Sequence, residues 1–381
     1  MKRVLFIGYH FHPEYYTPHT FHTEGIATGL SKSGFQVDLV IPAMEGRDGF
    51  FEKRDIKNLK IHTIEPGYKF LSMVGRATQY ALSAVDYIKK TGLHKEVDLM
   101  LTTASPFSCH MAGLLVKRAN KSLPWFADYG DPHTFNPFKQ KPLTLKQHLT
   151  LTLLKRKIDE WIERAAVKRM EKIIIPIEEA RSAYYNLNVR PEQIEVIPLL
   201  YEYKTEEYEY ENINSTRLNI LYAGAFDLHY RNPMEFFSAY KKLIESGKKM
   251  RLHFFGDLTD LNRYLAELEM DKEQFQIFAN VYIPRPKMLY LMRKMDLLVN
   301  INNAFKEQLP SKVIDYINSE IRVLNIGNAL FDEFVNVTNN REDIHEKLSN
   351  INKSDREIDY GDLAKKFNYE LNLKKYVQLL S

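Results

Sequence analysis

The strongest constraint in this sequence is the alternation of short β-type runs with helical segments, which occurs twice along the chain. The runs Lys2–Gly8, Gln36–Ile41 and Val97–Thr103 are separated by helical patterns, and the alternation restarts at Leu218–Gly224, after the acidic, tyrosine-rich stretch Tyr201–Tyr210. Strands that alternate with helices of about 10–15 residues require crossover connections, which give parallel sheets. We therefore predict an α/β chain of two Rossmann-like, doubly wound parallel-sheet domains that face a cleft.

Length and composition agree with this division. A chain of 381 residues suits two domains, which we place at residues 1–198 and 199–365, with a C-terminal helix of about 366–381 that can pack back on the first domain. The hydrophobic content of 44% and the net charge of +4 exclude a mainly disordered chain. No apolar run approaches the roughly 20 residues of a membrane span, and the run Val4–Ile7 is too short for a signal-peptide core. The single cysteine, Cys109, cannot form an internal disulfide, so we expect a reducing, cytoplasmic location.

The most informative loop precedes a predicted helix over 311–319. Pro310 and Ser311 favour a helix start, with serine as the cap, and Lys312 adds a cation at the same end. A helix N-terminus directed at the carboxyl edge of a sheet suits a diphosphate. Glu307 and Asp315 are separated by seven residues, and their carboxylates can accept hydrogen bonds from sugar hydroxyls. From the spacing alone, a capped amphipathic helix with ordinary surface charges is the stronger interpretation.

The same segment resembles the E-x7-E signature of retaining glycosyltransferases of the GT-B fold, in the family 4-like group. Glu307 matches the first glutamate, Asp315 stands in place of the second, and Pro310-Ser311-Lys312 lies between them, as in many bacterial members. The resemblance implies Glu307 as a catalytic residue near the sugar. It implies Ser311, Lys312 and Asp315 as residues that bind the nucleotide-sugar donor, with Asp315 near the ribose.

Three further positions extend the resemblance. Gly224 ends a strand, and Arg231 follows seven residues later, where the family has a Lys or Arg for the donor diphosphate. Ala225 replaces an arginine that is common there. Gly256 ends the next strand close to the donor, and Tyr282 lies in the loop that usually reads the base, although Tyr282 can equally belong to the core.

The first domain is expected to hold the acceptor. The candidate acceptor-side residues are His10, His12, His19 and Ser105, and the candidate catalytic residues are Asp131 and His133. Four histidines in a short stretch, His22 included, invite a metal site, but their spacing does not fit an ordinary zinc site, so we expect no metal. An Asx-turn before Pro132 explains Asp131 equally well, and a plain helix cap explains Ser105.

The predicted function is transfer of a sugar from a nucleotide-diphosphate sugar to a glycan or lipid-linked acceptor, without a cofactor or metal, in bacterial surface polysaccharide or glycoconjugate synthesis. Between Lys139 and Lys172, ten basic residues face four acidic ones, which can attract an anionic membrane surface; a solvated helix face is the plainer interpretation. No nucleic-acid-binding signature is present. Two alternatives remain open: a sugar-nucleotide 2-epimerase of the same fold, and a catalytically silent partner that binds nucleotide-sugar.

Overall fold

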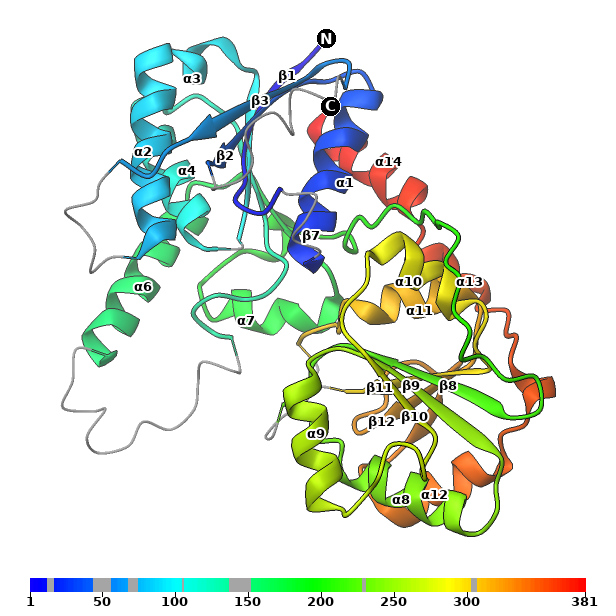
Figure 1. Cartoon of the computed structure of the whole chain (residues 1–381). Helices are drawn as coiled ribbons and strands as arrows, with labels where there is room; N and C mark the ends of the chain where they lie inside the picture. Colours follow the sequence, from blue (N-terminus) through cyan, green and yellow to red (C-terminus); the bar gives the residue numbers. More distant parts are fainter. Residues whose placement is uncertain are drawn as a thin grey trace. The chain divides into compact units, whose positions relative to one another are not determined.

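A computed structural model gives the fold of residues 1–11, 17–43, 56–67, 75–104, 106–136, 152–227, 231–302 and 307–381. The chain forms two compact units (Figure 1). Unit 1 consists of Met1–Glu202 together with Tyr369–Ser381, and unit 2 consists of Tyr203–Asn368. The first unit thus ends at Glu202, whereas the sequence placed the boundary after residue 198.

Within the described part of unit 1, seven strands form one sheet in the order β3-β2-β1-β4-β5-β6-β7, and every neighbouring pair is parallel. The central strands are apolar on both faces, as expected for a sheet covered by helices on both sides. The strands are β1 (Arg3–Ile7), β2 (Gln36–Pro42), β3 (Leu59–Ile64), β4 (Leu99–Thr103), β5 (Trp125–Asp128), β6 (Lys172–Ile175) and β7 (Ile194–Val196).

Helices follow most of these strands. The helical segments of unit 1 are α1 (Pro18–Lys32), α2 (Arg76–Thr91), α3 (Leu93–Glu96), α4 (Ser108–Ala119), α6 (Thr152–Val167), η3 (Glu178–Ala180), α7 (Arg181–Tyr185), η4 (Pro191–Gln193) and α14 (Tyr369–Leu380).

The C-terminal helix α14 belongs to unit 1 although it follows the whole of unit 2 in the chain. Leu373 and Tyr376 enter the core that also contains Ile26 and Leu30 of α1. The Tyr369 hydroxyl donates to the Gly25 carbonyl of α1, at 3.1 Å. The chain therefore crosses from unit 1 to unit 2 and returns.

Unit 2 repeats the architecture with a six-stranded parallel sheet in the order β10-β9-β8-β11-β12-β13, counted over its described residues. Its strands are β8 (Leu218–Ala223), β9 (Met250–Phe255), β10 (Ile277–Asn280), β11 (Leu297–Ile301), β12 (Val323–Ile326) and β13 (Val335–Val337). Its helical segments are α8 (Met234–Glu245), α9 (Leu258–Glu267), α10 (Arg285–Met292), α11 (Lys312–Ser319), α12 (Arg341–Asn350), η5 (Lys353–Asp355) and α13 (Gly361–Lys366).

The order of these strands fixes where a ligand can bind. From β8 the chain proceeds to β9 and β10 on one side, and then returns to β11 on the other side of β8. The loops that leave β8 and β11 therefore diverge, and such a switch point is where open α/β sheets bind ligands. The prediction of two doubly wound α/β units is confirmed.

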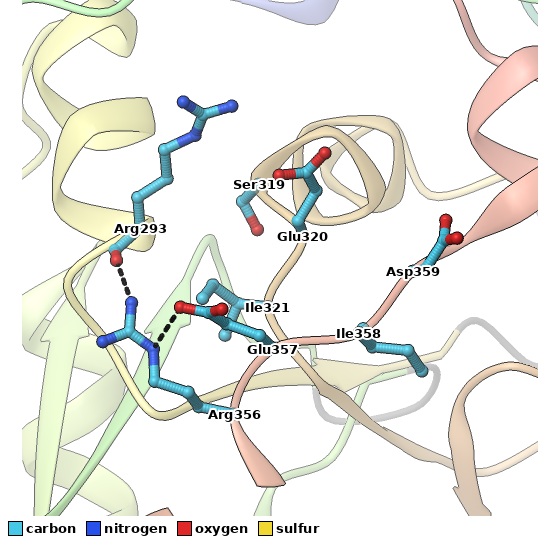
Figure 2. A pocket seen from close by; sticks show the side chains of 8 residues that line it. All are labelled: Arg293, Ser319, Glu320, Ile321, Arg356, Glu357, Ile358 and Asp359. Carbon is cyan, nitrogen blue, oxygen red and sulfur yellow. Dashed lines mark hydrogen bonds and ion pairs between the residues drawn. The ribbon is translucent and has the colours of Figure 1, made fainter. Parts of the chain in front are cut away.

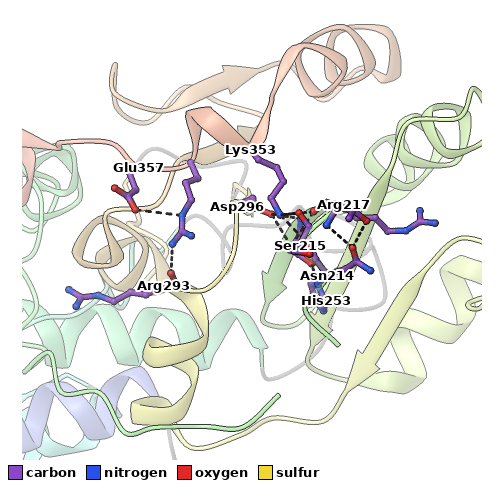
Figure 3. Close-up of polar contacts among 11 residues, drawn as sticks. Asn214, Ser215, Arg217, His253, Arg293, Asp296, Lys353 and Glu357 are labelled. Carbon is purple, nitrogen blue, oxygen red and sulfur yellow. Dashed lines mark hydrogen bonds and ion pairs between the residues drawn. The ribbon is translucent and has the colours of Figure 1, made fainter. Parts of the chain in front are cut away.

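Lys353 makes polar contacts at the opposite, amino-terminal edge of this sheet. Its ammonium donates to the carbonyl oxygens of Ser215 and Arg217, both at 3.0 Å, and lies 3.3 Å from the Asp296 carboxylate (Figure 3). The same carboxylate accepts the Asn219 backbone N–H at 2.8 Å. These contacts tie the segment after α12 to the start of β8, so this edge is stabilised by the protein's own groups.

Candidate functional site

The candidate site lies at the carboxyl ends of β8 and β9 in unit 2, where two glycines allow the backbones to approach closely. Gly224 has a φ of +136°, a conformation that L side chains rarely adopt. A Cβ on Gly256 would lie 2.3 Å from the Gly224 carbonyl oxygen. Both positions therefore require glycine for the backbone path, independently of any ligand contact.

Lys312, the first residue of α11, lies directly beside this glycine turn. A Cβ on Gly224 would lie 3.9 Å from the Lys312 Nζ, and this nitrogen is 4.0 Å from the centre of the Tyr222 ring. The Nζ atom is buried, and among the described residues it has no hydrogen-bond partner. The pKa of Lys312 lies well below its ordinary value because burial disfavours the charge and Arg231 repels it.

Arg231 supplies a second cation near the first. Its backbone N–H donates to the Asp227 carbonyl at 3.0 Å, which fixes the far end of the loop after Gly224. The Arg231 Nε is also buried and has no hydrogen-bond partner within the part of the chain that the structure describes. Two neighbouring cations with unsatisfied buried donors repel each other, and an anion placed between them would satisfy both.

The other residues expected on the donor side have different surroundings. Asp315 lies one turn into α11, where its Oδ1 accepts a hydrogen bond of 2.5 Å from Arg285 Nη2. Arg285 Nε lies 3.2 Å from both carboxylate oxygens. The expected contact between Asp315 and a ribose diol would therefore share this carboxylate with Arg285, a residue that the sequence analysis missed.

Ser311 occupies the position before α11, but its side chain makes no capping hydrogen bond, so the expected serine cap is wrong. Tyr282 follows β10 and is 59% exposed, so the alternative that it belongs to the core is also wrong. Glu307 is partly exposed and adjoins residues 303–306, which lie outside the described part of the chain.

In unit 1, the structure separates the histidines into different environments. The rings of His10 and His19 stack with their centres 5.4 Å apart. Burial, together with the charges of His10 and His22, lowers the pKa of His19 to about 4. No group of three or more His, Cys, Asp or Glu side chains suited to a metal ion occurs among the described residues. His12 and Ser105 lie outside those residues.

His22 has a structural role in unit 1. Its Nδ1 accepts the Leu200 backbone N–H at 2.9 Å, so its Nε2 carries the proton and donates to Asp128, also at 2.9 Å. The Tyr376 hydroxyl of α14 donates to the other Asp128 oxygen. This buried network holds α1, the end of β5 and the C-terminal helix together.

The loop after β5 carries Asp131 and His133. The His133 ring stacks on Phe107, with 4.1 Å between ring centres and 8° between planes. Asp131 is close enough to Tyr184 for its charge to contribute to the raised pKa of that buried hydroxyl, whose largest cause is burial itself. The structure thus brings Asp131 and His133 to one loop of unit 1.

Sequence reasoning also missed a buried histidine beside this loop. Thr102 Oγ1 accepts the Trp125 indole N–H at 2.9 Å, which leaves its own proton for His110 Nδ1 at 2.6 Å. His110 Nε2 therefore carries the ring proton, and it is buried without a hydrogen-bond partner among the described residues. Burial lowers the pKa of His110 well below its ordinary value.

A separate hollow of about 480 Å³ lies at the amino-terminal side of β12 in unit 2 (Figure 2). Inside it, Arg356 donates to the Arg293 carbonyl at 2.5 Å and lies 3.8 Å from the Glu357 carboxylate. Arg356 thus contacts other residues of the hollow, which lies at the edge opposite Gly224 and Lys312. The lining residues are Arg293, Ser319, Glu320, Ile321, Arg356, Glu357, Ile358 and Asp359.

Comparisons with known proteins bear on the fold. No protein-family model and no curated protein matches this chain. Among solved structures, it is similar to HepE from Anabaena in complex with UDP and glucose, with a TM-score of 0.66, 12% identity and coverage of 100% of this chain and 99% of that one. It is also similar to a glycosyltransferase from Rickettsia africae, with a TM-score of 0.61, 15% identity and coverage of 99% and 97%. A UDP-GlcNAc 2-epimerase from Neisseria meningitidis, bound to UDP-GlcNAc, has a TM-score of 0.61, 11% identity and coverage of 99% of both chains.

The fold is GT-B. Identities of this size establish the architecture, and both the transferase and the epimerase have it.

Proposed function

We propose that unit 2 binds the diphosphate of a nucleotide-sugar between Lys312 and Arg231, and that the protein transfers the sugar to an acceptor held by unit 1. The observation that carries the proposal is the buried Lys312 Nζ, which has no hydrogen-bond partner among the described residues and lies next to the Arg231 guanidinium. Leaving such donors unsatisfied is costly, whereas charge-assisted hydrogen bonds to phosphate are among the strong ones.

The proposed donor carries uridine. HepE was solved with UDP and glucose, and the Neisseria epimerase with UDP-GlcNAc. These ligands support UDP-sugars as the first donors to test. Tyr282 is the proposed contact for the base: partial burial raises the pKa of its hydroxyl, and the nearby charge of Arg231 opposes that rise.

The proposed chemistry follows from the two cations. As the bond from the sugar to the diphosphate breaks, negative charge develops on the leaving phosphate, and Lys312 and Arg231 stabilise it. Because two side-chain cations can neutralise this charge, we propose that no metal is required. We further propose retention of configuration, on the resemblance carried by Glu307 and Asp315, with Glu307 beside the transferred sugar.

A 2-epimerase is the second candidate, supported by the similarity to the Neisseria enzyme. An epimerase would use the same diphosphate site. The two functions differ in their products: a transferase releases UDP, whereas an epimerase returns a UDP-sugar with inverted configuration at C2.

The deciding experiment incubates the protein with UDP-glucose and with UDP-GlcNAc, with and without EDTA. Release of UDP, faster with an acceptor extract than without, would support transfer. Formation of the 2-epimer with no release of UDP would replace transfer by epimerisation. Binding of UDP without either product would identify a catalytically silent partner.

We also propose that helix α6 of unit 1 binds an anionic membrane surface, where a lipid-linked acceptor would be found. Residues 139–151 of the expected basic stretch lie outside the described residues, and α6 forms part of the remainder. On this helix Ile158 is 47% exposed and Trp161 is 66% exposed, with Lys157 beside them. Apolar side chains flanked by lysine suit an interface with anionic lipid. No helix in the described part of the chain is long and apolar enough to cross a bilayer.

Vesicle co-sedimentation tests this surface. Vesicles with phosphatidylglycerol should bind the protein at low salt, and Trp161→Ala should weaken binding several-fold. Tyr185→Ala, which removes another exposed aromatic residue from unit 1, is the control. Equal binding of the wild type and Trp161→Ala would contradict the proposed surface.

A further inference from the structure

A buried carboxylate lies beneath the loop that carries Asp131 and His133. Glu163 of α6 has no exposed surface, although acidic side chains rarely occupy such a position. It lies on the inner face of the helix with Ala166 and Val167, which are also buried, at the i, i+3 and i+4 spacing of a face that packs on a core. Burying a carboxylate is costly, and each hydrogen bond that it accepts offsets part of that cost.

Glu163 accepts a hydrogen bond from this loop. Its Oε2 accepts the Thr134 backbone N–H at 2.9 Å, one residue beyond His133. At the other end of the loop, the Tyr129 backbone N–H donates to the Ile174 carbonyl of β6 at 2.8 Å. The segment between Tyr129 and Thr134 is therefore held at both ends, first by a strand and then by a side chain.

Two tyrosines lie close to the carboxylate. The rings of Tyr129 and Tyr184 are 5.2 Å apart, and both residues are buried. Burial raises the pKa of each hydroxyl, and the charge of Glu163 raises it further. Glu163 thus faces neutral phenols and a backbone N–H, which suits a fixed hydrogen-bond acceptor.

We propose that Glu163 is a positioning residue, whose carboxylate holds the Thr134 N–H and thereby fixes the loop that presents Asp131 and His133 to the reacting sugar or acceptor. The proposal rests on the proposed function, since it assumes that this loop serves sugar transfer. Glu163 does not touch substrate, because its side chain is buried.

Three substitutions on α6 separate the effect of losing the hydrogen bond from the effects of losing the charge and of altering the packing. Glu163→Gln keeps an oxygen that can accept the Thr134 N–H and removes the charge. Glu163→Met has similar length and helix propensity but no acceptor. Glu160→Met is the matched control, because Glu160 lies one turn earlier, is partly exposed and pairs with Arg164 at 2.7 Å.

Steady-state kinetics with a UDP-sugar tests whether the position of this loop affects the reaction. Glu163→Met should lower kcat by about 100-fold with the donor KM unchanged, because a small misplacement of reacting groups has effects of this size and the donor is held by unit 2. Glu163→Gln should stay within about threefold of the wild type, and Glu160→Met should equal it. A Glu163→Met enzyme with wild-type kcat would overturn the proposal, as would a Glu163→Gln enzyme as impaired as Glu163→Met.

Hydrogen exchange tests the same hydrogen bond without any activity. In the wild type, the Thr134 amide should exchange slowly, as core amides do, and Glu163→Met should speed its exchange at least tenfold. Fast exchange in the wild type would overturn the proposal even if the Met variant failed to fold. Slow exchange in a protein that turns over no UDP-sugar would instead retain the role of Glu163 in the loop and reject the proposed reaction.

Discussion

Replacing Lys312 with methionine should stabilise the unliganded protein and weaken UDP binding by roughly 100-fold. Methionine has nearly the length of lysine and carries no charge, so it can occupy the same space against Tyr222. The wild-type ammonium is buried without a hydrogen-bond partner among the described residues, and Arg231 repels it. Its attraction to the Tyr222 ring, 4.0 Å away, compensates only in part.

The magnitude follows from these contacts. An uncompensated buried charge costs several kcal/mol, and a desolvated cation–π contact returns about 2 kcal/mol. At a pH below the lowered pKa of Lys312, where the free side chain is charged, the net gain from Lys312→Met should therefore be about 1–2 kcal/mol, which corresponds to roughly 2–8 °C in Tm for a unit of this size. Loss of a charged hydrogen bond to phosphate should cost about 3 kcal/mol of binding, or a UDP affinity lower by roughly 100-fold.

Thermal unfolding with and without UDP, together with titration calorimetry, measures both effects. Lys287→Met is the control, because Lys287 lies in the first turn of α10 in the same unit and forms a surface pair with Glu206 at 3.5 Å. This variant should change Tm and UDP affinity little. A Lys312→Met protein that is less stable than the wild type and binds UDP equally well would refute the reasoning.

Three further predictions follow from pKa shifts and backbone geometry. Because the pKa of Lys312 is lowered in the free protein and an anion favours its charged form, UDP binding should take up a proton, and affinity should fall as pH rises from that lowered pKa towards 10.5; calorimetry in two buffers of different ionisation enthalpy measures the uptake. His253 is buried with a pKa lowered to about 4, so the unfolded chain binds its proton at higher pH than the folded one; the contribution of His253 to the unfolding free energy should fall by up to roughly 3 kcal/mol as pH decreases from about 6.5 to about 4, in addition to the contributions of His19 and His110, whose pKa values are also lowered, in denaturant titrations. Glu320 ends α11 with a φ of 60°, so Glu320→Gly should raise stability by about 0.5–1 kcal/mol, whereas Glu346→Gly inside α12 should lower it by about 1 kcal/mol in the same assay.

The sequence predicted the strands and helices that have strong local patterns. Leu218–Gly224 is a nearly continuous apolar run bounded by a glycine, and β8 occupies Leu218–Ala223. Strand β3, by contrast, was not predicted, because Leu59–Ile64 is at the edge of its sheet and half exposed, so its polar and apolar residues do not form a buried run.

The candidate site was predictable only where local sequence patterns define it. The loop ending in Pro310 and Ser311 indicated that Lys312 begins a helix near the carboxyl edge of the sheet, and this is local information. The burial of Lys312 against Tyr222, and the pairing of Asp315 with Arg285, join residues that are far apart in the chain. Such contacts depend on how elements pack, which spacing along one element does not encode.

The burial of Glu163 also could not be predicted from the sequence of its own helix. The basic stretch that contains it suggested a solvated helix face, and Lys157 and Trp161 are indeed exposed. The opposite face of α6 packs on the core, and it places a carboxylate under the loop with Asp131 and His133. Which face is buried depends on the neighbouring helix α4 and the sheet.

A crystal structure of the complex with UDP would show whether Lys312 and Arg231 hold the diphosphate. We expect oxygens of the diphosphate to lie within about 2.7–3.2 Å of Lys312 Nζ and of the Arg231 guanidinium, beside the Gly224 turn. A diphosphate bound elsewhere, with both cations still without an anion, would contradict this expectation.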